Sequence, residues 1–323
     1  MKKILCYGLP MVVVLLVSVL LSSNLYAAPR FPAPRKIEPI VSTEWLEANH
    51  NLENLVLVDM RTAAEYNSGH IPGSINVPFE VPFSAWVTMI DDLLLELPDP
   101  DSLFRMIGSC SITNDSLVVI VTSFPAPPEP PYPLANATRA AATLIYAGLK
   151  NVAILDGGYT KWAAEARPST TEAPFVQGVE YQGQIRRDMF VSKEELKRRG
   201  RPQADLIDAR DADVYFGVTI EPYANKAGHI PNAKSLPTPW IWNQDGTYKP
   251  MDELAQMASG ILNEGRHRNK NREIIVYCGT GGYATAWWFV LSEMLGYNDV
   301  KIYDGSAQEW VRENEMTKYT WSE

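Results

Sequence analysis

The sequence predicts an α/β fold built from two homologous domains, each a mainly parallel sheet flanked by helices. Short apolar runs rich in β-branched residues alternate with longer helical patterns along most of the chain. The order of motifs that begins near residue 40 recurs about 150 residues later. A polar, proline-containing segment separates the two copies. We therefore predict one domain over residues 40–165, a linker over 166–187 and a second domain over 188–323.

Three pairs of matching segments define the repeat. The pairs are 55–61 with 206–210, 69–73 with 228–232, and 148–158 with 296–306. Trp162 and Trp310 follow the last pair at matching places. Each Gly-His-Ile-Pro turn carries a histidine, His70 or His229, which we expect to be structural and bonded to backbone.

The first residues have the pattern of a secretory signal peptide. Lysines follow Met1, an apolar run spans residues 11–21, and small residues stand at Ala27 and Ala28. The apolar run is too short to favour a membrane span. We expect a signal peptide over residues 1–27 and an exported protein, periplasmic or extracellular, without stable membrane insertion after cleavage. A retained N-terminal anchor is the alternative.

Composition limits the function further. The net charge of −9 is dispersed, which argues against a nucleic-acid surface. After signal cleavage only Cys110 and Cys278 remain, too few for a disulfide scaffold. The four histidines form no ligand pattern with the cysteines, so no metal site is predicted.

Cys278 stands where chemistry is expected. An apolar run over residues 274–277 reads as a buried strand, and a helix is predicted from Ala284 to Gly296. The loop between them contains Gly279, Gly281 and Gly282. Such a loop can point several N–H groups at the cysteine sulfur, and the helix N-terminus adds partial positive charge. Both effects favour a thiolate or a persulfide. The alternative is a small buried hydrophobic residue at a strand end.

The first copy lacks these features. Its strand, residues 117–122, is followed by Ser123, which we align with Cys278, and then by a proline-rich segment. Prolines remove the N–H groups that a sulfur site needs, and a serine without an adjacent base is a poor nucleophile. We predict that the first domain is degenerate and inactive and that it supplies a wall of the site.

This layout resembles the two-domain rhodanese family of sulfurtransferases, of an exported bacterial type, over nearly the whole mature chain. The resemblance implies that Cys278 is catalytic. It also implies an orienting Asp208 and these substrate-binding residues: Arg210, Gly279, Thr280, Gly281, Gly282 and Tyr283. Arg210 would reach the substrate anion; the alternative is a salt bridge with Asp208 or Asp213.

The resemblance implies transfer of sulfane sulfur from thiosulfate, or a related donor, to cyanide or a thiol through a persulfide on Cys278. No cofactor is expected, the partners are the small-molecule donor and acceptor, and an acceptor protein stays unknown. The loop carries no charge, unlike those of many thiosulfate-using members, so 3-mercaptopyruvate is an alternative donor. A non-catalytic sulfane-sulfur carrier or sensor is a second alternative. A cysteine phosphatase is disfavoured, because Ala284 stands where its arginine is needed.

Overall fold

The computed structural model describes residues 35–124, 128–199, 204–262 and 270–319. The residues from Arg35 onward form one compact unit. The predicted signal peptide, residues 1–27, lies outside the described residues.

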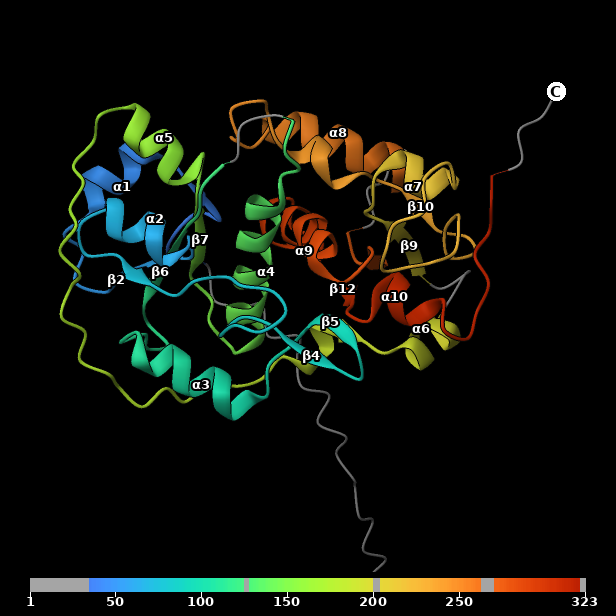
Figure 1. The fold of residues 1–323 in the computed structure, drawn as a ribbon, viewed down its shortest axis with the longest axis horizontal. Coiled ribbons are helices and arrows are strands. Elements are labelled where there is room, and N and C mark those ends of the chain that lie inside the picture. The colour runs from blue at the N-terminus through green and yellow to red at the C-terminus, as the bar shows by residue number, and fades with distance from the viewer. Residues whose placement is uncertain (1–34, 125–127, 200–203, 263–269, 320–323) are drawn as a thin grey trace, which may run out of the picture. The chain divides into compact units, whose positions relative to one another are not determined.

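The first domain is built on a five-stranded parallel sheet in the order β1-β7-β6-β2-β3 (Figure 1). Its strands are β1 (Ile40–Val41), β2 (Leu55–Asp59), β3 (Ile75–Asn76), β6 (Leu117–Val121) and β7 (Val152–Leu155). The helices of this part are α1 (Thr43–Asn49), α2 (Ala63–Ser68), α3 (Pro100–Ser109), α4 (Tyr132–Tyr146) and α5 (Gly158–Ala164). An antiparallel hairpin of β4 (Thr88–Ile90) and β5 (Leu93–Glu96) precedes α3.

The second domain repeats this topology, with a five-stranded parallel sheet in the order β8-β12-β11-β9-β10. Its strands are β8 (Phe190–Val191), β9 (Ala204–Asp208), β10 (Lys234–Ser235), β11 (Glu273–Tyr277) and β12 (Val300–Tyr303). Its α-helices are α6 (Lys193–Arg199), α7 (Ala212–Phe216), α8 (Met251–Leu262), α9 (Gly282–Phe289) and α10 (Ser306–Trp310). Short helical turns cover Arg187–Met189 and Thr238–Ile241, and a π-helical segment over Val290–Met294 extends α9. The predicted fold class is confirmed.

The strand register corrects one alignment made from the sequence. Asp59 pairs with Val121, and Asp208 pairs with Tyr277. Because the two aspartates are equivalent in the repeat, the residue equivalent to Cys278 is Thr122 and not Ser123. Thr122 is buried and donates a hydrogen bond to the backbone oxygen of Pro133, 3.1 Å away. Both Thr122 and Ser123 lack a thiol, so the first copy still differs from the second at this place.

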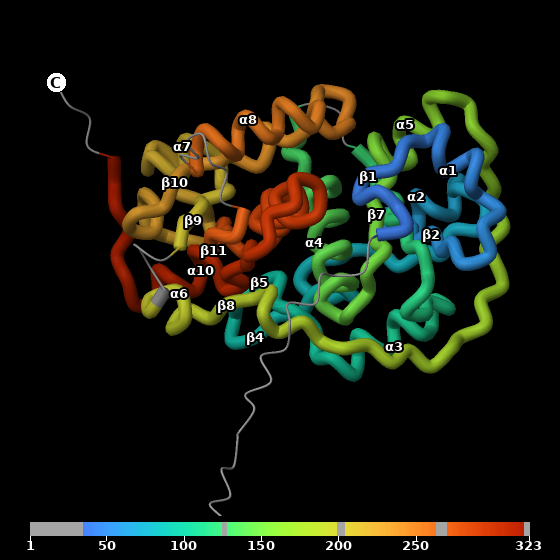
Figure 2. Tube along the Cα trace, turned by 180° about the vertical axis from the view of Figure 1, so that it is seen from behind, coloured from blue at the N-terminus to red at the C-terminus, as the bar shows by residue number. Residues whose placement is uncertain are grey.

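Helices α4 and α9 pack against each other, and Figures 1 and 2 show them side by side. The sequence allows this because α4 presents buried alanines and threonines, whose small side chains permit close approach. Oγ1 of Thr138 lies 3.0 Å from Oγ1 of Thr285. Trp287 and Trp288 are buried, as their helical spacing predicts.

The β4–β5 hairpin contacts the second domain. The Leu94 backbone N–H donates to Gln308 Oε1, and Gln308 Nε2 donates to the Leu94 backbone oxygen. The buried Arg139 of α4 pairs with Asp304, which follows β12, and donates to the Leu95 backbone oxygen. A second buried carboxyl group, Glu96, lies in the field of Asp304. Burial, with the Asp304 charge next, raises the pKa of Glu96 to about 8.

This raised pKa predicts a pH-dependent stability. The folded state holds the Glu96 proton more tightly than the unfolded chain does. Its contribution to stability is therefore full below the ordinary pKa of 4.5 and is lost as the pH rises through about 8. Glu96→Gln should flatten the free energy of unfolding over this window, measured by urea titration at several pH values. The matched control is Glu53→Gln at an exposed site; an equal flattening by both variants would contradict the prediction.

Candidate active site

Cys278 lies directly after β11, at the carboxyl edge of the second parallel sheet. The loop that follows turns sharply at Gly281, whose φ of +89° falls in the region that favours glycine. This turn aims the Gly281 N–H at Cys278 Sγ, with an N–S distance of 3.1 Å. Helix α9 begins one residue later, at Gly282 rather than at the predicted Ala284. The amide group predicted to face the sulfur is therefore present.

Two opposing influences act on the Cys278 thiol. Burial is the larger one and raises the pKa of Cys278 above its ordinary value. Hydrogen bonds from the backbone N–H groups of Ala284, Thr280 and Gly281 lower it, and the Glu221 carboxylate raises it. The loop amides therefore lower the pKa of Cys278, as expected. Burial raises this pKa by more, so the net shift disfavours the thiolate.

The turn that follows β12 is hydrogen-bonded to the start of the loop. The Cys278 backbone N–H donates to Ser306 Oγ at 3.2 Å, and the Ala307 N–H donates to the Cys278 backbone oxygen at 2.9 Å. The Gln308 N–H donates to the Gly279 backbone oxygen at 3.0 Å. These bonds connect the cysteine to the residues that contact the hairpin of the first domain.

Arg210 is enclosed by protein oxygen atoms. Its Nε lies 3.0 Å and its Nη2 lies 2.7 Å from the carboxylate of Asp208, and Nη2 also donates to the Gly228 backbone oxygen at 2.7 Å. Its Nη1 lies 3.0 Å from Oε1 of Glu221. Only 2 % of the Arg210 side chain is exposed. The salt bridge with Asp208, which the sequence offered as an alternative, is present, and Glu221 adds a second one. A contact of Arg210 with the substrate anion stays a prediction.

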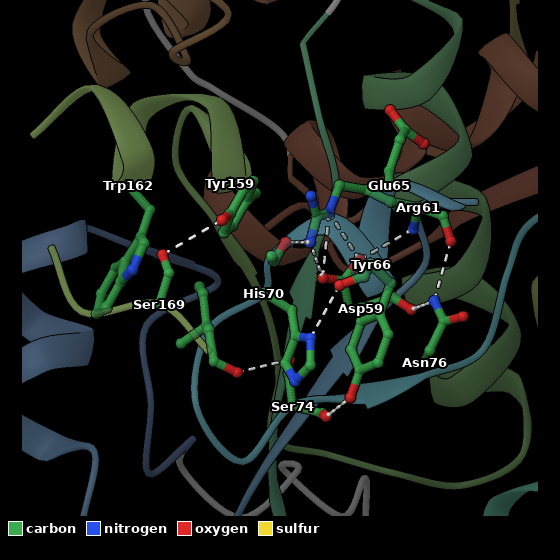
Figure 3. A network of polar contacts seen from close by, with 12 residues as sticks. Asp59, Arg61, Glu65, Tyr66, His70, Ser74, Asn76, Tyr159, Trp162 and Ser169 are labelled. Atoms are coloured by element: carbon green, nitrogen blue, oxygen red, sulfur yellow. Dashed lines mark hydrogen bonds and ion pairs between the residues drawn. The ribbon is translucent and has the colours of Figure 1, made fainter. Parts of the chain in front are cut away.

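The first domain contains the same ion pair. Arg61 contacts Asp59, with Nη2 to Oδ2 at 2.6 Å, and donates to the Gly69 backbone oxygen at 2.9 Å (Figure 3). The Asp-x-Arg contact is therefore a structural device of the repeat that ties each strand end to a Gly-His-Ile-Pro turn. The two domains differ in the further contact that each arginine makes. The Arg61 guanidinium lies 3.7 Å from the ring centre of Tyr159, whereas Arg210 contacts the carboxylate of Glu221.

Glu221 is the functional candidate that the sequence did not reveal. A methyl group built on Gly279 would lie 2.6 Å from its Oε2, so the carboxylate packs against the loop backbone. Burial raises the pKa of Glu221, while Arg210 opposes that rise. One signal was available: eighteen residues separate Arg210 from Gly228, against eight between Arg61 and Gly69. The longer segment carries Glu221 toward the loop.

Two acidic and three aromatic side chains interact electrostatically near the loop, where Glu221 packs against Gly279 and the rings of Tyr132 and Tyr283 are in contact. We call this set the acidic–aromatic cluster: Asp211, Glu221, Tyr132, Tyr223 and Tyr283. The ring centres of Tyr132 and Tyr283 are 5.7 Å apart. Burial raises the pKa of Tyr132, and Tyr223, Asp211 and Glu221 raise it further. The Tyr283 pKa rises through burial and through Asp211, Tyr132 and Cys278. Since Tyr132 begins α4, the first domain supplies part of the cluster, as its predicted role as a wall requires.

The remaining candidates have structural contacts. Nδ1 of His70 lies 2.9 Å from the Tyr66 backbone oxygen, and Nδ1 of His229 lies 2.9 Å from that of Tyr215. Both rings also stack on those tyrosines. Cys110 and Cys278 are free thiols. Within the ranges that the structure describes, no His, Cys, Asp and Glu side chains gather in threes as metal ligands would, and no helix is long and apolar enough to cross a bilayer.

Comparison with known proteins agrees with the fold. The profile of the family described as "Rhodanese-like domain" matches residues 42–165 and 192–313. The chain is 30% identical over 288 residues to "Sulfur carrier protein TtuD" of Thermus thermophilus, covering 84% of this chain and 93% of that protein. It is also 30% identical over 288 residues to a "Putative thiosulfate sulfurtransferase" of Mycobacterium leprae, covering 84% and 94%.

Two solved structures share the fold. The 3-mercaptopyruvate sulfurtransferase-type protein SseA of Escherichia coli superposes with a TM-score of 0.68 at 24% identity, covering 84% of this chain and 99% of that one. An anaerobic ergothioneine biosynthesis enzyme of Chlorobium limicola superposes with a TM-score of 0.72 at 22% identity, covering 87% and 71%. The chain therefore belongs to the rhodanese-like family, with two such domains in tandem. It is a sulfurtransferase of that family.

The buried ion pairs predict matched losses of stability. Arg210→Ala and Arg61→Ala should each cost about 3–5 kcal/mol, because each leaves a buried aspartate without its partner. Denaturant titration of both variants measures the two losses. If Arg61→Ala is destabilised while Arg210→Ala keeps its stability and only raises KM, Arg210 is a substrate anchor after all.

Proposed function

We propose that this protein transfers sulfane sulfur through a persulfide on Cys278. The observation that carries the proposal is the N–H of Gly281 directed at Cys278 Sγ, at the carboxyl end of β11. The thiolate attacks the outer sulfur of thiosulfate, and its electron pair forms the new S–S bond. The bond between the two thiosulfate sulfurs breaks and sulfite leaves with that electron pair, which leaves Cys278–S–S⁻. The loop amides stabilise this anion.

An acceptor then completes the cycle. Cyanide or a thiolate attacks the outer sulfur of the persulfide, the S–S bond breaks, and Cys278 leaves as the thiolate. Two successive displacements at one cysteine give double-displacement kinetics. Thiosulfate as the donor has the support of relatives such as the "Putative thiosulfate sulfurtransferase" of Mycobacterium leprae. Export to the periplasm or the cell exterior remains a proposal from residues 1–27.

Two further functions have specific support. 3-Mercaptopyruvate as the donor fits a loop without charged residues, and SseA is a protein of the 3-mercaptopyruvate type. A sulfur carrier fits the similarity to the sulfur carrier protein of Thermus thermophilus. Repeated turnover with excess thiosulfate and cyanide distinguishes an enzyme from a carrier, which would yield one equivalent of thiocyanate.

Replacement of the two cysteines tests the assignment of Cys278. Cys278→Ser should lower thiocyanate formation by on the order of a thousandfold or more, because the serine cannot form a persulfide. Cys110→Ser should keep most of the activity, since Cys110 ends α3 in the first domain. Equal losses in both variants, with both still folded, would point to a partnership of the two thiols instead.

A cation placed in the loop tests the preference for the donor. Tyr283→Arg should lower KM for thiosulfate about tenfold, equivalent to about 1.4 kcal/mol, because it supplies a charge for a dianion. The effect on 3-mercaptopyruvate should be smaller, since that donor carries one carboxylate. Tyr283→Gln is the neutral control for the loss of the ring. An improved KM for 3-mercaptopyruvate with no change for thiosulfate would reverse the assignment of the donor.

A further inference from the structure

The charges around Cys278 are unusual for a site that handles anionic sulfur compounds. Glu221 packs against Gly279 and raises the pKa of Cys278, so negative charge lies close to the reacting sulfur. The negative charge of Asp211 acts on Tyr283, in the first turn of α9. Like charges repel at this range, especially where burial weakens screening. An anionic acceptor would therefore approach Cys278 against an unfavourable field.

Three cations of the described residues that could act on the loop have carboxylate partners. Arg210 is shared by Asp208 and Glu221, and its side chain is almost fully buried. Arg139 lies behind Gly281 and pairs with Asp304. Lys226, which could have compensated for the uncharged loop, contacts Glu315 and the Asn314 backbone oxygen instead. Each of these three groups is paired with a carboxylate in the structure.

The aromatic members of the cluster have the opposite property. Tyrosine faces attract cations electrostatically, and an ammonium group held between rings and a carboxylate gains from both. Tyr132 and Tyr223 are each more than half exposed, at 58% and 54%, so their rings are available to a small molecule. Tyr132 faces Tyr283 across 5.7 Å. Three rings and two carboxylates beside one cysteine match the chemistry that recognises an ammonium ion.

We propose that the acidic–aromatic cluster binds the positively charged group of the sulfur acceptor, which is a small thiol bearing an ammonium group. This inference rests on the proposed function, in which Cys278 carries the transferred sulfur. The acceptor thiolate attacks the outer sulfur of Cys278–S–SH. A new S–S bond forms, the bond to Sγ breaks, and Sγ leaves as the thiolate. The product is the persulfide of the acceptor, R–S–SH, and no oxidant or reductant is consumed. Glu221, which shares the single charge of Arg210 with Asp208, and Asp211 supply the negative charge that holds the ammonium group while the thiolate end of the acceptor reaches the sulfur.

The test compares three small thiols of different charge on the persulfide-loaded protein. Cysteamine carries an ammonium group, 2-mercaptoethanol is neutral and 3-mercaptopropionate carries a carboxylate. Loss of the persulfide from Cys278 is followed by mass spectrometry in single-turnover reactions, at equal concentrations of thiolate. In the wild type the rate constants should fall in the order cysteamine, 2-mercaptoethanol, 3-mercaptopropionate. The preference should shrink with added salt.

Variants of the cluster residues test whether the cluster causes the preference for cysteamine. Glu221→Gln should reduce the ratio of the cysteamine and 3-mercaptopropionate rate constants about tenfold, the scale of one charge at close range in a partly screened site. Tyr132→Leu, at an exposed ring, should reduce the same ratio without removing a charge. The matched control is Glu315→Gln, which removes a carboxylate that contacts Lys226 outside the cluster, and it should leave the ratio unchanged.

The outcomes separate the two proposals. If thiosulfate and other donors never load sulfur onto Cys278, the proposed function fails. If the persulfide forms but the wild type shows no preference for cysteamine, the cation-binding cluster is wrong and the proposed function survives. The cation-binding cluster is equally wrong if Glu221→Gln and Tyr132→Leu leave the ratio of rate constants unchanged, or if Glu315→Gln lowers it as much as they do.

Discussion

The buried ion pair between Asp208 and Arg210 is the contact on which the site depends. It joins the end of β9 to the Gly-His-Ile-Pro turn through the Gly228 backbone oxygen. Tyr277 strengthens it, since its hydroxyl donates to Asp208 at 2.6 Å and accepts the Ile230 N–H at 2.9 Å. Tyr277 directly precedes Cys278, so the network that holds the arginine also sets the start of the loop. A buried pair of this kind is retained only when its remaining hydrogen-bonding groups find partners.

The same pair limits the positive charge that side chains supply near Cys278. Because Arg210 is held by Asp208 and then by Glu221, the positive potential at Cys278 comes from backbone N–H groups instead of side chains. Amides that are fixed by the turn need no reorganisation when charge develops on sulfur. Their strength is limited by burial, which holds the pKa of the resting thiol above its ordinary value. The site therefore stabilises negative charge on sulfur through fixed backbone N–H groups and not through a charged side chain of the loop.

Local sequence patterns predicted much of the fold. The features that they did not predict depend on contacts between distant parts of the chain. The two parallel sheets and the place of Cys278 depend on apolar periodicity and on glycines, which the sequence displays directly. The residue equivalent to Cys278 in the first copy depends on strand register, so Thr122 was missed by one position. The contacts of Arg210 with Glu221, and of Arg139 with Asp304, join residues that fold together only in three dimensions. The longer segment between Arg210 and Gly228 indicates a difference at this place, but no spacing in the chain identifies the two partners of either contact.

The fate of the transferred sulfur atom tests the mechanism most directly. The purified protein would be treated with thiosulfate, freed of excess reagent and digested at acidic pH, and its peptides would be weighed by mass spectrometry. We expect one added sulfur atom on the peptide that contains Cys278, removed again by cyanide with release of thiocyanate. Sulfur on the Cys110 peptide instead, or no sulfur on either, would contradict the central claim that Cys278 is the carrier of the transferred atom.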